Sequence, residues 1–97
     1  PKRLARLIVG HEVWTVPQMG WAGLTNGVLL SRVDGAFDAF ITVDGNLAAQ
    51  QNPATWSFGV IVLRAPSNAL GALTPLAPTI LAALAQLQPR DIIRVGF

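Results

Sequence analysis

Two apolar runs near the middle of the chain limit what it can fold into. The first extends from Ala39 to Val43 and the second from Phe58 to Leu63, and both are almost uninterrupted by polar residues. A strand that is apolar on both sides is typical of a parallel sheet with helices on both faces. Asp44 and Gly45 end the first run. We therefore expect two buried parallel strands, with a carboxylate at the carboxyl end of the first.

The segments around these runs alternate between helix and strand patterns. Pro75 and Pro78 are expected to break the long helical segment, which begins at Ser67 or Asn68, because proline removes a backbone donor. The order helix, strand, helix, strand, strand, helix, strand predicts an α/β fold. We expect a single domain over residues 1–97, with three layers and a mainly parallel sheet of about four strands. The other predicted helices cover residues 1–10 and 27–33, and the other predicted strands cover His11–Val16 and Asp91–Val95.

The chain carries little charge for its size. Charged residues make up 12% of it and hydrophobic residues 52%, whereas ordinary domains carry about 25% charged residues. No residue from Ala65 to Pro89 is charged, but the prolines and polar residues of this stretch argue against a membrane span. We therefore expect part of the surface to lie in a homo-oligomer interface, although Trp21 could instead cover the core as a lid. The expected interface residues are Trp14, Trp21, Leu76, Ile80 and Leu84.

The absence of cysteine excludes several kinds of chemistry. Disulfides, thiolate metal ligands and cysteine nucleophiles are all removed together. The first residues show no apolar stretch followed by a small-residue cleavage site, so no signal peptide is expected. A cytoplasmic location fits both observations. The single histidine, His11, starts a predicted strand, where a structural role is more common than that of a general base.

Three segments resemble, in order and spacing, a family of short bacterial PIN-like proteins. They are HEVWTVPQMGWAGLTNG, FDAFITVDGNLAAQQN and VIVLRAPSNALGALTPLAPTILAAL, and they cover nearly the whole chain. The family is classed by similarity as toxins of toxin–antitoxin pairs. The resemblance implies a Rossmann-like fold, a ribonuclease site that uses magnesium or manganese, and an antitoxin protein as a partner.

The chain departs from the family pattern in its acidic residues. Relatives usually begin with a strand of the type ILLDE, whose acids are expected to bind metal, and this sequence shows no such strand before the first helix. Val28 stands where relatives often have an acid. Asp44 alone matches, as a catalytic residue and metal ligand with Asn46 beside it, and an ordinary Asp-Gly turn is the alternative for it. One carboxylate with neighbouring amides makes a weak magnesium site.

Two functions are consistent with this pattern. One is a PIN-like relative that is catalytically impaired and acts by self-association or by binding a protein partner such as an antitoxin. The other is a metal-dependent ribonuclease in which Asp44 holds the metal and basic residues bind RNA phosphates. The small number of acids favours the first, because the chain has five in all. Four of them would lie at the opposite edge of a parallel sheet from Asp44, namely Glu12, Asp34, Asp38 and Asp91. The basic candidates, for which a solvated surface is the alternative, are Lys2, Arg3, Arg6 and Arg64.

The missing strand also has a structural consequence. If the family strand lies centrally in the sheet, its absence leaves open edges on His11–Val16 and on Ala39–Val43. An uncovered apolar edge promotes association. We expect these two strands either to pair with each other or to pair with strands of a second copy of the chain.

Overall fold

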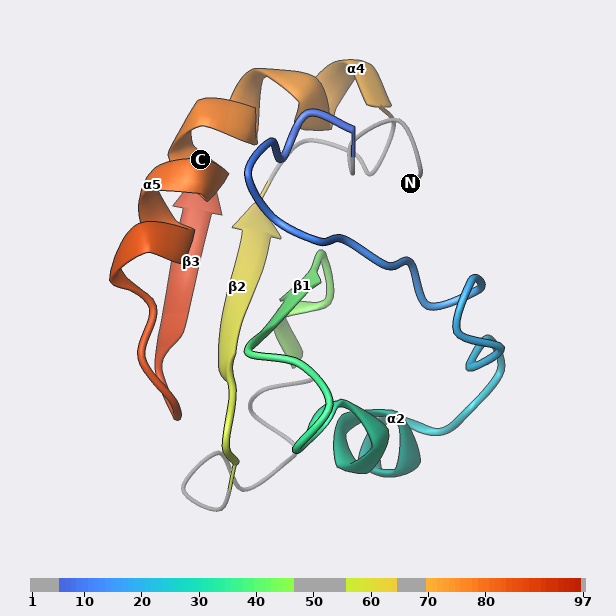
Figure 1. Cartoon of the computed structure of the whole chain (residues 1–97). Coiled ribbons are helices and arrows are strands. Elements are labelled where there is room, and N and C mark those ends of the chain that lie inside the picture. Colours follow the sequence, from blue (N-terminus) through green and yellow to red (C-terminus); the bar gives the residue numbers. More distant parts are fainter. Residues whose placement is uncertain (1–5, 47–55, 65–69, 97) are drawn as a thin grey trace.

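The core of the molecule is a sheet of three parallel strands. The computed structural model describes residues 6–46, 56–64 and 70–96 (Figure 1). The strands β1 (Ala39–Thr42), β2 (Gly59–Arg64) and β3 (Ile92–Gly96) lie in the order β1-β2-β3, and both pairs are parallel. This confirms the α/β class and the parallel sheet. The described residues form three strands where about four were expected, and β1 stands at an edge.

The helix α2 (Asn26–Val33) covers one face of the sheet, and its bounds agree with the helix predicted over residues 27–33. Its apolar residues recur at helical spacing, so that Leu29, Leu30 and Val33 are all buried. Thr25 stands at the N-cap, but its side chain makes no capping hydrogen bond. The first turn is closed by the backbone, through a 2.8 Å hydrogen bond from the Leu29 N–H to the Thr25 carbonyl.

The other face is covered by a helical segment that prolines divide. α4 (Leu70–Leu73), a 3-10 turn (Thr74–Leu76) and α5 (Ala77–Gln86) follow one another. Pro75 lies in the 3-10 turn and Pro78 in the first turn of α5, so the predicted break occurs where proline removes backbone donors. The predicted caps of this segment, Ser67 and Asn68, lie outside the described residues. None of the described helices has both the length and the apolar character needed to cross a membrane.

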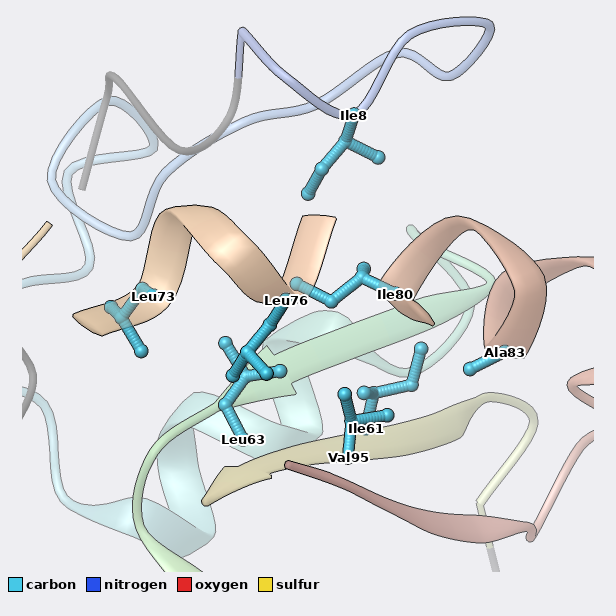
Figure 2. Close-up of a cluster of buried hydrophobic side chains, with 8 residues drawn as sticks. All are labelled: Ile8, Ile61, Leu63, Leu73, Leu76, Ile80, Ala83 and Val95. Atoms are coloured by element: carbon cyan, nitrogen blue, oxygen red, sulfur yellow. The ribbon is translucent and has the colours of Figure 1, made fainter. Parts of the chain in front are cut away.

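β2 is the most deeply buried strand, and its side chains alternate between two apolar clusters. Ile61 and Leu63 belong to the cluster under α4 and α5, whereas Val60 and Val62 belong to the cluster under α2. Fully burying one such side chain stabilises the fold by about 1.5–3 kcal/mol, so the clusters hold the three layers together. The first cluster, shown in Figure 2, contains Ile8, Ile61, Leu63, Leu73, Leu76, Ile80, Ala83 and Val95, and the second contains Leu30, Val33, Trp56, Phe58, Val60 and Val62.

The N-terminal segment forms no strand, which corrects the prediction for His11–Val16. Residues 11–15 have irregular backbone, and residues 16–20 form a turn with a 3.0 Å hydrogen bond from the Gly20 N–H to the Pro17 carbonyl. None of the described strands is hydrogen-bonded to this segment, although His11–Val16 line the same groove as β1. The expected first helix is also not seen in its described part, because residues 6–10 are turn and bend. Ile8 nevertheless joins the first cluster (Figure 2).

Candidate functional site

A groove runs along the free edge of β1. Its volume is about 1170 Å³, and α2 lines one wall with Leu29 and Val33. The opposite wall includes Leu73 of α4 and Leu84 of α5, a half-buried residue that was predicted at an interface. In Figure 1 the chain from residue 6 passes over the carboxyl end of the sheet and reaches α2 without running beside β1. The groove therefore occupies the place of a fourth strand, between the two helical layers that cover β1.

The backbone of β1 has hydrogen-bonding groups that face this groove. The Gly59 N–H donates to the Asp38 carbonyl over 3.1 Å, which sets the register of β1 on β2. In a parallel ladder the backbone groups of successive residues point alternately to either side, so Phe40 faces β2 while Ala39 and Ile41 face the groove. Within the described part of the chain, no strand pairs with β1 on that side. An added strand would find donors and acceptors already in position.

The side chains of β1 are only half-buried, unlike those of β2. All four residues of β1 have intermediate exposure, whereas the first five residues of β2 are buried. Ile41 packs against the first cluster and Phe40 against the second, so both helical layers extend as far as β1. A strand added at this edge would complete the burial of β1 and would itself be covered on both faces.

The two edges of the sheet differ in their protection against pairing. Natural sheets block open edges with short strands, charged residues or covering segments. β3 carries the exposed Arg94 within its length, and β1, which is short, has the uncharged sequence AFIT. The β1 edge therefore lacks the charge that would discourage another strand from pairing with it.

The charged residues that line the groove are acidic. Asp38 precedes β1, Asp44 follows it, and Glu12 belongs to the N-terminal segment. His11 also lines the groove, and none of the described arginines does. Glu12 accepts a 2.9 Å hydrogen bond from the indole N–H of Trp14. The groove thus combines apolar walls with negative charge at the two ends of β1.

Asp44, the residue expected to bind metal, shapes the backbone after β1. Its Oδ1 accepts the N–H of Asn46 at 3.0 Å, and its own N–H donates to Oγ1 of Thr42 at 3.0 Å. Gly45 and Asn46 have helical backbone, so the carboxylate stands where a helix N-cap would stand. Asp44 and Asn46 are both exposed. The contacts of Asp44 are those of a turn and cap residue.

The other acids do not gather around Asp44. Because the sheet is parallel, Asp38 before β1 and Asp91 before β3 lie at the opposite edge, as the sequence predicted. Among residues 6–46, 56–64 and 70–96, no group of three or more His, Cys, Asp or Glu side chains could hold a metal ion. Magnesium in nucleases is held by several oxygen ligands, carboxylates above all. The described residues do not assemble such a cluster.

The remaining predicted site residues lie in different parts of the structure. Trp14 is 50% exposed. Trp21 is half-buried, and its ring makes an edge-to-face contact with Phe37, which packs against the second cluster; the two ring centroids are 6.1 Å apart. Leu76 and Ile80 are 8% and 0% exposed, which corrects their assignment to a subunit interface, because both face the sheet (Figure 2). When the apolar face of a helix is wide, the spacing of its residues alone does not show which of them face the sheet and which face away from it.

The basic residues expected near RNA are exposed where they are described. Arg64 ends β2 at the carboxyl edge of the sheet, the same edge that Asp44 occupies, and Arg6 lies in the N-terminal segment. Lys2 and Arg3 lie outside the described residues. The structure therefore describes half of the expected basic set, and these two arginines belong to different segments.

Asp34, named from the sequence only among the acids expected at the opposite edge from Asp44, ties the end of α2 to the start of β2. Its carboxylate accepts the Ser57 N–H at 2.7 Å and the Ser57 hydroxyl, and Ser57 Oγ accepts the Gly35 N–H at 3.1 Å. The two bonds from Ser57 lower the pKa of Asp34 below its ordinary value of 3.8, and the bond from the hydroxyl has the larger effect. The contact fixes the end of the helix that forms one wall of the groove. Local sequence patterns could not reveal it, because the partners are 23 positions apart.

Comparisons with known proteins returned no match for this chain among protein-family models, curated proteins or solved structures. The resemblance to PIN-like proteins therefore stays an expectation from the sequence.

Proposed function

We propose that this domain binds polypeptide by accepting a strand of its partner at the free edge of β1. The observation that carries the proposal is the edge of β1, which no strand of the described residues pairs with and which lies in a groove with apolar side chains on both sides. In strand addition, main-chain hydrogen bonds supply affinity, and contacts to alternate side chains supply specificity.

The size of the groove suits one strand. A strand of five residues, with about 3.3 Å per residue, 4.8 Å between strands and about 10 Å of layer thickness, occupies about 800 Å³. The groove measures about 1170 Å³. Such a strand would be covered by Leu84 and Leu87 on one face and by Leu29 and Phe37 on the other. Its side chains should therefore be apolar on both faces, as in other strands of parallel sheets.

The proposal also accommodates the resemblance to PIN-like toxins. The chain would then be a catalytically impaired relative, and a strand from an antitoxin-like protein or from a second copy would take the place of the family's first strand. Two observations support the impairment: Asp44 makes local backbone contacts, and the described residues bring no cluster of acids together.

The ribonuclease alternative makes a different prediction. If Asp44 holds Mg²⁺ or Mn²⁺ beside RNA, cleavage of RNA should require the metal and should disappear in Asp44→Ala. Asp91→Asn, at the opposite edge of the sheet, is the matched control and should leave that cleavage unchanged. We expect no cleavage above the protein-free background, and metal-dependent cleavage with this pattern of variants would refute a function limited to binding.

Amide hydrogen exchange tests the open edge directly. In the free protein we expect the Phe40 N–H to be protected by β2, whereas the Ala39 and Ile41 N–H groups exchange much faster. A synthetic peptide, Gln-Gln-Val-Ile-Val-Leu-Val-Gln-Gln, serves as the probe because its five apolar residues match the groove. It should slow exchange at Ala39 and Ile41. No binding, or binding that leaves both N–H groups unprotected, would refute strand addition.

Two proline variants separate the groove side of β1 from its β2 side. Ile41→Pro removes an N–H that faces the groove, so the fold should survive while peptide binding is lost. Phe40→Pro, its matched control, removes an N–H that pairs with β2 and should destabilise the whole sheet. If Ile41→Pro does not fold, Ala39→Pro makes the same test at the first residue of the strand, where proline is tolerated. Unchanged peptide binding by a folded Ile41→Pro or Ala39→Pro variant would contradict the proposal.

A further inference from the structure

The two ends of the groove carry charge of the same sign. Asp38 and Asp44 are exposed and flank β1, with five residues between them. A bound strand with five residues opposite these would place its flanking residues near the two carboxylates. Glu12 adds a third negative charge to the lining, and no described arginine offsets it there.

Between these ends the groove offers little to a charged side chain. Both helical layers contribute apolar residues to its walls, such as Leu29 and Leu84, and Phe40 and Ile41 form part of its floor. The N-terminal segment lines the rest, where its polar residues His11, Glu12 and Thr15 lie. A charge placed in the middle of a bound strand would be removed from water without a partner, which is costly. A charge at either end would remain close to solvent and close to an aspartate.

We infer, on the basis of the proposed strand-binding function, that the partner segment is an apolar strand of about five residues flanked by lysine or arginine at both ends. The apolar part fills the groove, and the basic ends pair with Asp38 and with Asp44. Acidic ends would face the same carboxylates and be repelled. The charge pattern therefore selects among segments that could all pair equally well with the backbone of β1.

Three peptides that share one apolar core test this selection. The core Val-Ile-Val-Leu-Val is flanked on each side by two lysines, two glutamines or two glutamates, and calorimetric titration of the full chain gives the three affinities. We expect the lysine peptide to bind at least about tenfold more tightly than the glutamate peptide, with the glutamine peptide between them, since each exposed pair changes affinity by a few-fold. In about 1 M salt, where charges more than about 3 Å apart are screened, the difference should fall below about twofold.

Paired aspartate variants locate the charges responsible. Asp38→Asn combined with Asp44→Asn should remove most of the lysine preference, and asparagine keeps the acceptor that caps the backbone after β1. Asp91→Asn, compared with each single aspartate variant, is the matched control, because it removes one charge at a residue that does not line the groove. The control should keep the full lysine preference.

The outcomes distinguish this inference from the proposal on which it rests. If the glutamine peptide binds at β1 but the flanking charge changes affinity less than twofold, the inference is wrong and strand addition stands. If none of the three peptides binds, strand addition itself fails. A dimer by light scattering at micromolar concentration that Ile41→Pro converts to monomer would show that a second copy occupies the edge, and this would also overturn the inference.

Discussion

Replacing Gly59 with alanine tests how tightly the start of β2 is held. A Cβ at this position would lie 2.6 Å from Cδ1 of Leu87 and 2.8 Å from the Gln88 carbonyl oxygen, and it would also meet Cγ of Leu87. Carbon atoms in ordinary contact are about 3.5–4.0 Å apart, so the overlap is about 1 Å. The leucine could rotate, but the carbonyl belongs to the backbone that leads into β3.

The strand cannot move away from this overlap. The Gly59 N–H is bonded to Asp38 on one side, and the adjoining backbone is bonded to the chain before β3 on the other, with the Arg90 N–H donating to the Phe58 carbonyl over 2.9 Å. Overpacking of this kind destabilises the folded state by about 1–3 kcal/mol. Alanine also lowers the conformational entropy of the unfolded chain, which stabilises the protein by about 0.4–1 kcal/mol. We expect Gly59→Ala to lower the free energy of unfolding by about 1–2 kcal/mol, and the melting temperature by roughly 5–15 °C.

Chemical denaturation followed by circular dichroism measures this change. Gly71→Ala is the matched control, because a Cβ on Gly71 in α4 meets nothing within 4 Å. It should leave stability unchanged or raise it by up to about 1 kcal/mol, since alanine favours helix over glycine. A Gly59→Ala protein as stable as the wild type, or a Gly71→Ala protein destabilised to the same extent, would refute the argument that steric overlap at β2 is responsible.

Two further predictions concern Asp34 and the core. Because folding lowers the pKa of Asp34, its contribution should be complete above the ordinary value of 3.8 and should be lost as pH falls through the folded-state pKa. Melting temperatures from about pH 6 to pH 2.5 should therefore fall more steeply for the wild type than for Asp34→Asn, and parallel curves would contradict the role of the Ser57 contact. Ile80→Ala should cost about 2–5 kcal/mol in chemical denaturation, because Ile80 is 0% exposed. Thr79→Ala, on the exposed side of α5, should change stability by less than about 0.5 kcal/mol, and similar losses for both variants would show that the core is not as described.

The helix breaks and the central strand could be predicted because their signals are local. A run of apolar residues without alternation indicated that β2 is covered on both faces, and its first five residues are indeed buried. Pro75 and Pro78 mark the 3-10 turn and the start of α5, because the missing N–H acts on the backbone at the proline itself. Leu76 and Ile80 were recognised as apolar positions, but the side of the helix that meets the sheet was not fixed by their spacing.

The groove and its charges could not be predicted in the same way, because they depend on partners far apart in the sequence. His11–Val16 alternates like a strand, yet its backbone is irregular or turn, and the segment lines the groove without pairing with β1. Asp34 reaches Ser57 only after α2 and β2 have been placed.

The sequence by itself thus determined the α/β class and the parallel sheet, because apolar periodicity acts within each segment. Only the tertiary structure decided that β1 is an open edge, that two helical layers overhang it, and that Asp38 and Asp44 stand at its two ends. Strand pairing and layer packing join residues that no local pattern connects.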